Sequence, residues 1–453
     1  MTEVIAVFDI GKTNKKLLLF DNRFKVVYQR EEKFSCVEDS DGFECDDIDL
    51  ITTWISKSLA EIVSNKEFNL LAVNFSTYGA SLLFLNENGK RLTSVYNYLK
   101  EISPSISENL YKEYGGKEEF CRKTASPALG LLLNSGIQIL WLKQEKPELF
   151  NQAHSILHFP QYLSYSLTNK IVSEPTSIGC HTCMWDFDEM KYHKWIANKG
   201  ISLPEPITND VVTTTSVFRK EIKVGTGIHD SSASLVPYLK GSSEKFILVS
   251  TGTWCINMNP FNTEPLTAKQ LSQDCLCFLT PDKEQVKSSR LFMGHFHEVW
   301  AKKLATHFNV AADNFKTVKK NNQLIENLIA EFDGKSEFFH KGKDGFEEGL
   351  QTVDLGIFKS YEEAYTKLMI DLTDLCVDSI RLVIPENDET ETLFISGGFA
   401  RNEIFIHLMK SQFHNKNVHV SEIDNSSALG AALVIADVFA NVDISALDLG
   451  IKE

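Results

Sequence analysis

The sequence predicts an α/β protein made of two similar halves. Residues 4–8 form a short apolar run, and a second apolar run at residues 17–20 follows after a polar turn. This is the pattern of a buried β-hairpin. Residues 246–258 repeat it, with a Ser-Thr-Gly-Thr turn between two apolar runs. Because each half begins with the same pattern of two apolar strands around a polar turn, we expect two duplicated domains that face each other across a nucleotide.

The rest of the first half alternates strand and helix signals. Residues 49–64 are predicted to be a helix, and apolar runs at 70–75 and 81–85 are predicted to be strands. Residues 128–167 are predicted to be helical, with prolines opening two of the helices.

A polar stretch at residues 240–245 is the best candidate for a domain junction. We therefore expect an N-terminal domain over residues 1–241 and a C-terminal domain over residues 242–453.

Composition limits the classes of function. The 453 residues are 43% hydrophobic and 24% charged, as in globular enzymes with large cores. A net charge of −15 opposes binding to nucleic acid or to an anionic membrane. The sequence shows neither a membrane-length apolar stretch nor the pattern of a signal peptide. We expect a cytoplasmic protein whose partner is a small molecule, with a homodimer left open.

The nine cysteines do not predict a disulfide framework or a metal site. They are odd in number and scattered along the chain. Cys180 and Cys183, with Cys275 and Cys277, are candidate halves of a zinc site in the sequence. The second pair, however, has one intervening residue. Structural zinc sites usually have two to four, so zinc is disfavoured.

The tripeptide Gly11-Lys12-Thr13 matches the end of a P-loop motif, but the rest of that motif is missing. A P-loop needs a glycine where this chain has Ala6, inside an apolar strand. What remains is a polar hairpin turn whose amides and hydroxyls suit a phosphate, with Asp9 at the strand end suited to Mg²⁺. The alternative is an ordinary turn, since such residues favour turns for backbone reasons.

A third glycine site follows a predicted strand at residues 391–395. Gly397 and Gly398 break this strand before a helix predicted to begin near Glu403. Paired glycines there let a flat ring or a phosphate approach the backbone, although tight strand-helix packing explains them equally well. Residues 428–432 are small and predict a helix packed closely on a sheet, to which we assign no chemistry.

These three motifs, in this order, resemble those of the FGGY family of carbohydrate kinases, in the actin and hexokinase superfamily. Residues 9–16 resemble the first phosphate motif, residues 250–253 the second, and residues 396–402 the adenosine motif. Residues 139–176 are also similar to the N-terminal domain of the family. The resemblance implies two ribonuclease H-like domains, each a mixed sheet flanked by helices, with ATP, Mg²⁺ and sugar in the cleft between them.

The resemblance also implies roles for particular residues. Asp230, in a Gly-x-x-Asp turn, matches the catalytic base, whereas from the residues alone we would expect it to cap a helix. Asp9 would hold Mg²⁺, directly or through water. The residues expected to bind ATP and its phosphates are Gly11, Lys12, Thr13, Asn14, Lys16, Thr251, Gly252, Thr253, Gly397, Gly398, Phe399 and Asn402. The residues expected to bind the acceptor are Thr77, Tyr78, Gly79 and His229.

The acceptor motif is only partly like that of the rhamnulokinase-like branch. Tyr78 and Gly79 match its aromatic-glycine pair, but Ser81 stands where that branch places an acid, and residues 95–99 lack the usual acid and arginine. His229 and the Thr13-Asn14 pair favour a 6-deoxyketohexose, L-rhamnulose or L-fuculose, whose methyl end suits an aromatic wall such as Tyr78. Xylulose or ribulose stays open, as does a non-catalytic or ATP-hydrolysing member of the superfamily.

Overall fold

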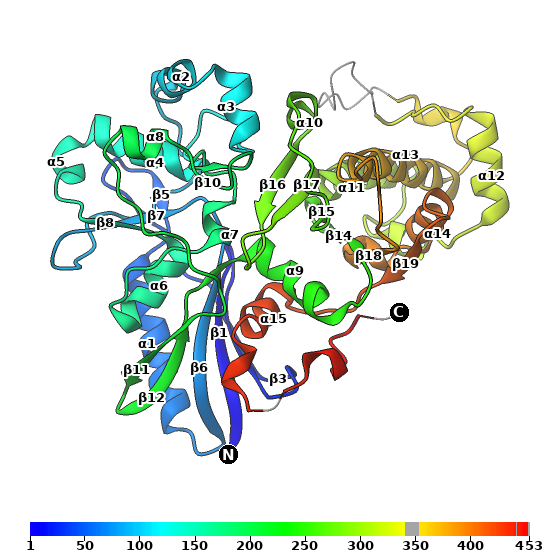
Figure 1. Ribbon diagram of the computed structural model, residues 1–453. Coiled ribbons are helices and arrows are strands. Elements are labelled where there is room, and N and C mark those ends of the chain that lie inside the picture. The colour runs from blue at the N-terminus through cyan, green and yellow to red at the C-terminus, as the bar shows by residue number, and fades with distance from the viewer. Residues whose placement is uncertain (340–352, 441, 452–453) are drawn as a thin grey trace. The chain divides into compact units, whose positions relative to one another are not determined.

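The computed structural model describes residues 1–339, 353–440 and 442–451, and these form two compact units. Unit 1 comprises Met1–Ser242, Cys277–Gln285 and Asp424–Leu449, and unit 2 the remaining described residues. The first crossing, at Ser242, lies within the polar stretch expected to be a junction. The two later segments that return to unit 1 have no counterpart in the expected ranges 1–241 and 242–453. Each unit is described by itself below (Figure 1).

Unit 1 is built on a mixed sheet. Its strands run in the order β11-β12-β6-β1-β2-β3, and β13 pairs with β6. These strands are β1 (Thr2–Ile10), β2 (Lys15–Phe20), β3 (Val26–Glu32), β6 (Phe68–Thr77), β11 (Val212–Val217), β12 (Lys220–Gly225) and β13 (Ile228–His229). The remaining elements of the unit are β4 (Val37–Glu38), β5 (Glu44–Cys45), α1 (Ile48–Ser64), β7 (Leu82–Leu85), α2 (Pro104–Glu113), α3 (Lys117–Lys123), α4 (Ser135–Glu145), α5 (Pro147–Phe150), β8 (Ser155–His158), α6 (Phe159–Thr168), α7 (Pro175–Ile178), β9 (Trp185–Asp186), β10 (Lys191–Tyr192), α8 (Trp195–Asn198), α9 (Asp230–Gly241), α15 (Ser426–Leu433), η4 (Ala436–Val438) and η5 (Ile444–Ala446).

Strand register brings three predicted site residues to one end of this sheet. β1 and β2 form the predicted antiparallel hairpin. β6 runs parallel to β1, with Asp9 opposite Ser76. β13 continues beside β6, with His229 opposite Thr77. Because the ends of parallel strands meet at one edge of a sheet, Asp9, Thr77 and His229 lie close together.

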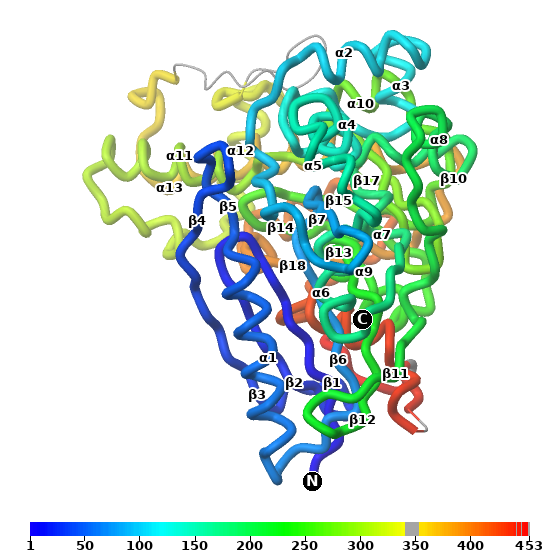
Figure 2. Tube along the Cα trace, turned by 90° about the vertical axis from the view of Figure 1, so that its left-hand side faces the viewer, coloured from blue at the N-terminus to red at the C-terminus, as the bar shows by residue number. Residues whose placement is uncertain are grey.

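The two faces of β1 have different roles. Val4, Ala6, Phe8 and Ile10 are buried in a core with residues of α1 and α6, and Figures 1 and 2 both show α1 lying along the sheet. The alternate side chains, which include Asp9, point to the opposite face. There α15 approaches the sheet, and the side-chain amide of Asn74 donates to the carbonyl of Ala431 at 2.7 Å. The period of two thus separates core residues from the face that carries Asp9.

Unit 2 is built on a second mixed sheet, in the order β16-β17-β15-β14-β18-β19, of which residues 277–279 of β16 and Gln285 of β17 are counted with unit 1. Its hairpin, β14 and β15, is antiparallel, and β18 is parallel to β14. Helix α13 crosses this sheet, and Asn257 of β15 donates to Ser379 of α13 at 3.0 Å. The elements are β14 (Phe246–Thr251), β15 (Cys255–Asn259), α10 (Ala268–Ser272), β16 (Cys275–Leu279), β17 (Gln285–Leu291), α11 (Met293–His307), η1 (Asn314–Thr317), α12 (Asn322–Glu331), η2 (Leu355–Ile357), α13 (Tyr361–Arg381), β18 (Thr392–Gly397), η3 (Gly398–Arg401), α14 (Glu403–Gln412) and β19 (Asn417–Val420).

Two local predictions were wrong. Residues 128–167 were predicted to be helical throughout, but Ser155–His158 forms β8, which pairs with β7. Asp230 was expected to precede a helix as its cap, but His229 is the cap and Asp230 is the first residue of α9. In the part of the chain that the structure describes, no helix is long and apolar enough to cross a membrane.

Candidate active site

The carboxylates of Asp9 and Asp230 form the centre of the candidate site in unit 1. Asp9 ends near the edge of the sheet on β1, and its Oδ2 accepts a hydrogen bond from Ser427 of α15 at 2.9 Å. Burial and the negative charge of Asp230 raise the pKa of Asp9 to about 6. Burial also raises the pKa of Asp230 to about 6, against hydrogen bonds from Ser231, although 35% of its side chain stays exposed. Two neighbouring carboxylates that titrate near neutrality are suited to proton transfer and to holding a cation.

His229 lies next to Asp230 and is enclosed. Its Nε2 is 3.2 Å from Oδ1 of Asp230 and 3.4 Å from the sulfur of Cys180. A Cβ added at Gly79 would stand 3.0 Å from the same Nε2, so the glycine leaves room for the ring. Burial lowers the pKa of His229 to about 4, which keeps the imidazole neutral at pH 7. The structure therefore brings together His229, Gly79 and Asp230.

The first polar turn is closed by its own backbone. The amide of Gly11 donates to the carbonyl of Asn14 at 3.0 Å. Lys16 donates to the side chain of Asn425 at 3.0 Å, and its charge partly offsets the raised pKa of Asp9. Thr13 is exposed, whereas Asn14 has a buried side-chain oxygen that meets no hydrogen-bond donor in the part of the chain that the structure describes. Lys16, rather than Lys12, is thus the lysine on the Asp9 side of the turn.

Lys12 is held elsewhere, against tyrosine rings. Its ammonium donates to Oδ2 of Asp46 at 2.9 Å and lies 5.3 Å from the ring centre of Tyr78 and 5.8 Å from that of Tyr98. The hydroxyl of Tyr78 donates to Asp46 at 2.6 Å. The buried Lys15 donates to the other oxygen of Asp46 at 2.7 Å. The structure therefore groups Lys12 with a predicted acceptor residue, Tyr78.

Two predicted ATP motifs of unit 2 lie side by side. Thr251 is opposite Gly397 in the register of β14 and β18. The amide of Phe399 donates to the hydroxyl of Thr251 at 3.1 Å. A Cβ added at Gly397 would stand 1.7 Å from the carbonyl oxygen of Thr251, and the φ angle of Gly397 is +86°. Only glycine allows this approach.

The surfaces of these turns are open. Gly252, Thr253 and Gly398 are exposed, and a Cβ added at Gly398 would meet nothing within 4 Å. At the same turn, Gly294 of α11 packs so closely that an added Cβ would stand 2.2 Å from the carbonyl oxygen of Gly252. One side of the turn is therefore braced by α11, whose Gly294 amide donates to the carbonyl of Thr253 at 3.1 Å, and the amide of Gly252 donates to the carbonyl of Trp254 at 2.9 Å.

Asn402 and Phe399 have structural partners. The side-chain oxygen of Asn402 accepts from the amides of Ile404 and Phe405 at 3.0 and 3.1 Å and so caps α14. Its amide group donates to the hydroxyl of Tyr365 at 3.1 Å. Phe399 is buried, with its ring 5.3 Å from that of His297. The side chains of these two predicted ATP residues thus support the turn at residues 396–402 through contacts inside the protein.

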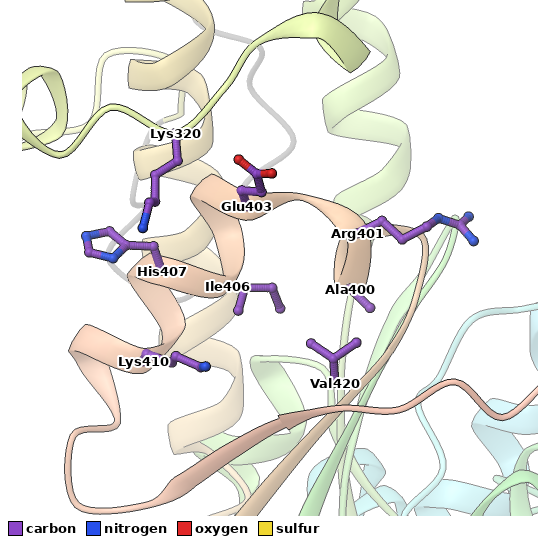
Figure 3. A pocket seen from close by; sticks show the side chains of 8 residues that line it. All are labelled: Lys320, Ala400, Arg401, Glu403, Ile406, His407, Lys410 and Val420. Carbon is purple, nitrogen blue, oxygen red and sulfur yellow. The ribbon is translucent and has the colours of Figure 1, made fainter. Parts of the chain in front are cut away.

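A pocket of about 430 Å³ adjoins this motif in unit 2 (Figure 3). It lies beside η3 and α14, and Figure 3 shows the side chain of Arg401 directed away from its centre. The volume lies in the range of small-molecule sites. The lining residues are Lys320, Ala400, Arg401, Glu403, Ile406, His407, Lys410 and Val420.

Several residues around the site were not found from the sequence. Ser427 and Asn425, which reach Asp9 and Lys16, lie just before residues 428–432, the segment that was assigned no chemistry. Asp46 and Tyr98 surround Lys12, and their only sequence signal was a carboxylate and a tyrosine in loops. Among the described residues, no group of three or more His, Cys, Asp or Glu side chains is placed to hold a metal ion. The nine cysteines are free thiols, and eight of them are buried.

Comparison with known proteins gives the family. The model of the FGGY family of carbohydrate kinases, N-terminal domain, matches residues 4–231, and that of the carbohydrate kinase FGGY, C-terminal domain, matches residues 243–443. The chain belongs to the FGGY family of carbohydrate kinases. The resemblance stated from the motifs is thereby confirmed, and the prediction of a carbohydrate kinase is confirmed at the level of the family.

Relatives of this FGGY chain agree with that assignment. A rhamnulokinase from Oceanobacillus iheyensis is 24% identical over 229 residues, which are 48% of this chain and 47% of the relative. The aligned stretch thus spans about half of that protein. The structure of a carbohydrate kinase from Novosphingobium aromaticivorans has a TM-score of 0.79 at 20% identity. The match covers 97% of this chain and 92% of the chain of that kinase. A xylulose kinase from Rhodospirillum rubrum has a TM-score of 0.77 at 14% identity, with coverages of 99% and 93%. These likenesses confirm the predicted fold class, two domains that each contain a mixed sheet.

Proposed function

We propose that this protein is an ATP-dependent sugar kinase that transfers the γ-phosphoryl group of ATP to a hydroxyl of a ketose. The observation that carries the proposal is the pair Asp9 and Asp230, whose pKa values are both raised to about 6 beside the acceptor motif. The closely packed, exposed glycines of unit 2 support a nucleotide there. Membership of the FGGY family supports the same reaction class.

In the proposed mechanism, Asp230 accepts the proton of the attacking hydroxyl. The hydroxyl oxygen forms a bond to the γ-phosphorus while the bond from that phosphorus to the β,γ-bridging oxygen breaks, which leaves ADP. The proton passes to the carboxylate of Asp230 and then to solvent. His229, neutral at pH 7, packs against Asp230 and limits the positions that its carboxylate can take.

The carboxylates at this site fit Mg²⁺. Asp9 offers a hard oxygen ligand close enough to Asp230 for the two charges to repel, and a divalent cation relieves that repulsion. Asp9 would hold the ion directly or through water. When bound, Mg²⁺ supplies charge neutralisation to the phosphoryl groups. On the nucleotide side, the exposed turn at Gly252 and Thr253 and the open space at Gly398 are suited to phosphate and to ribose.

For the acceptor, we propose a 6-deoxyketohexose, L-rhamnulose or L-fuculose. The partial likeness to a rhamnulokinase supports this choice. A pentulose, xylulose or ribulose, is the second candidate, because Ser81 stands where the rhamnulokinase-like branch places an acid. Ser81 is buried, and its hydroxyl has no hydrogen-bond partner among the described residues. Tyr78 is buried as well, with its hydroxyl held by Asp46, so it presents little surface to a methyl group.

The test is ADP release with Mg²⁺ and ATP across L-rhamnulose, L-fuculose, L- and D-xylulose, L- and D-ribulose and glycerol. We expect one strong responder, and Asp230→Asn should lower its kcat by about 10²- to 10⁴-fold, the range for a lost general base. An ADP release rate that no sugar changes would indicate an ATPase instead. Equal turnover in Asp230→Asn would place the base elsewhere.

A further inference from the structure

We propose that Lys12 recognises the hydroxyl-bearing chain of the sugar acceptor, and that Asp46 is the positioning residue that aims its ammonium group. This inference rests on the proposed function and deepens it, because it names a specificity residue for the acceptor. It also departs from the expectation that Lys12 binds phosphate. The contacts of the first turn carry it.

Lys12 and Lys16 leave the first turn toward different neighbours. Lys16 contacts Asn425 and acts electrostatically on Asp9. The ammonium of Lys12 instead lies over the rings of Tyr78 and Tyr98. Tyr78 directly precedes Gly79, where an added Cβ would stand 3.0 Å from Nε2 of His229. Lys12 therefore lies over the ring of the residue next to the glycine that adjoins His229.

Asp46 fixes the position of that ammonium group. Its two oxygens accept hydrogen bonds from Lys15, Tyr78 and Lys12 at 2.7, 2.6 and 2.9 Å. Burial alone would raise the pKa of Asp46, but these three donors hold it below its usual value, so Asp46 is ionised at pH 7. A buried carboxylate with three donors has one available geometry, and this restricts Lys12 to one region.

The charge balance leaves Lys12 able to bind a ligand. Lys15 is buried, and its ammonium also donates to the carbonyl of Lys12 at 3.0 Å. One carboxylate thus serves two lysines, and the cluster carries one unit of positive charge in excess. The side chain of Lys12 keeps 27% of its exposure. Of its three N–H donors, one meets Asp46 in the described part of the chain, which leaves donors for acceptor hydroxyls.

Aromatic rings beside an ammonium group suit a carbohydrate. Tyr98 is partly exposed and packs edge-on against Tyr78, with ring centres 6.1 Å apart. A polyhydroxylated chain presents C–H groups to such a ring and oxygen atoms to the cation. A phosphate contact from Lys12 would require the ammonium to leave both tyrosines and Asp46.

The test separates the Michaelis constants for the two substrates. Lys12→Met, Asp46→Asn and the double variant are compared with Asp49→Asn, whose carboxylate is exposed and pairs with Arg91 at 2.6 Å. Removing a charged hydrogen-bond donor costs about 10- to 100-fold. We expect Lys12→Met to raise the KM for the acceptor by that factor, with the KM for ATP within about two-fold. Lys12→Arg should recover part of the loss, and Asp49→Asn should match the wild type.

The double variant decides the role of Asp46. If Asp46 acts through Lys12, the double variant has the acceptor KM of Lys12→Met alone. If the factors by which Lys12→Met and Asp46→Asn raise the acceptor KM multiply in the double variant, Asp46 is not a positioning residue for Lys12. A rise in the KM for ATP without one for the acceptor would overturn the role of Lys12. Should Asp46→Asn fail to fold, because buried Lys15 loses its partner, Tyr78→Phe replaces it in the same cycle.

Calorimetric titration of the same sugars in the absence of ATP keeps the two proposals distinguishable. Sugar binding that Lys12→Met weakens, without any phosphorylation by the wild type, would overturn the kinase proposal and support the recognition role. Phosphorylation with an unchanged acceptor KM in Lys12→Met would support the kinase proposal and overturn the recognition role of Lys12. A wild-type protein that binds no sugar of the panel would overturn both.

Discussion

At the residue scale, Asp9 and Asp230 determine how activity depends on pH. Their pKa values are raised to about 6, and the proposed base must be ionised. We expect kcat/KM for the acceptor to fall about ten-fold per pH unit below pH 6 and to level off above it. A pH–rate profile between pH 5 and 8 at a limiting Mg²⁺ concentration, where the cation does not lower these pKa values, measures this. A profile that stays flat down to pH 5 would contradict the assignment of Asp230.

The same raised pKa has a consequence for stability. The folded-state pKa of Asp230, about 6, lies above the ordinary value of 3.8. The contribution of the Asp230 carboxyl to the stability of the folded state is therefore complete below about pH 4, and it is lost as the pH rises through 6. Asp230→Asn removes the buried charge and should stabilise the apoprotein at pH 7.5 by about 1 kcal/mol, a value reduced because the side chain is partly exposed.

Thermal unfolding checks this prediction. A gain of that size should raise the midpoint by about 2 to 4 °C at pH 7.5 without Mg²⁺. The difference should shrink as the pH approaches 4, where the wild-type carboxyl is protonated. A variant less stable than the wild type at pH 7.5 would show that the hydrogen bonds from Ser231 to Asp230 outweigh the cost of its burial.

The residue scale also shows what the sequence can reveal about a site. Asp9 and Asp230 were found because each lies inside a local motif. Asp46 was missed because its partners are 31 to 34 residues away along the chain, and Ser427 because it is 418 residues from Asp9. Local patterns identify turns and strand ends. They do not tell which distant loop supplies the partner of a buried charge.

At the element scale, Gly397, the last residue of β18, and Gly398, which follows it, have different roles. Gly397 has a φ of +86° and no room for a Cβ beside Thr251, whereas Gly398 has open space. We expect Gly397→Ala to destabilise the protein by about 2 to 4 kcal/mol, since strain and a backbone clash combine. Gly398→Ala should change stability by less than about 1 kcal/mol but weaken ATP binding.

Urea unfolding followed by circular dichroism and titration with an ATP analogue measure the two effects. Gly398→Ala is the matched control for stability, because it adds the same methyl group one residue away. A Gly397→Ala variant as stable as the wild type would mean that β18 can shift away from β14. Unchanged nucleotide binding in Gly398→Ala would remove that residue from the proposed ATP site.

Elements were predictable where their own side chains determine them. The hairpin of β1 and β2 was predicted correctly because apolar runs flank a polar turn, and α14 begins at Glu403 as expected. β8 was missed because its four buried residues adjoin helix α6 and are defined as a strand by pairing with β7. Such pairing is a long-range interaction, which local propensity does not contain.

At the scale of the whole molecule, unit 1 depends on a segment from near the end of the chain. Helix α15 packs against α9 so closely that a Cβ added at Gly430 would stand 1.8 Å from the carbonyl oxygen of Ala233. The carbonyl of Ala431 accepts a hydrogen bond from buried Asn74, and the hydroxyl of Ser427 donates one to Asp9. Unit 1 is therefore incomplete without residues 424–449.

A chain that ends at residue 423 tests this dependence. It loses the burial of Leu429, Leu433 and Ile435, each of which contributes about 1.5 to 3 kcal/mol. It also removes Ala431, the acceptor of the side-chain amide group of Asn74. Because the total stability of a domain is about 5 to 15 kcal/mol, we expect unit 1 to lose its cooperative unfolding transition. A chain that ends at residue 450 keeps α15 and is the control. Calorimetry of the two chains should show the transition of unit 1 in the longer chain alone, and equal transitions in both would mean that unit 1 folds without α15.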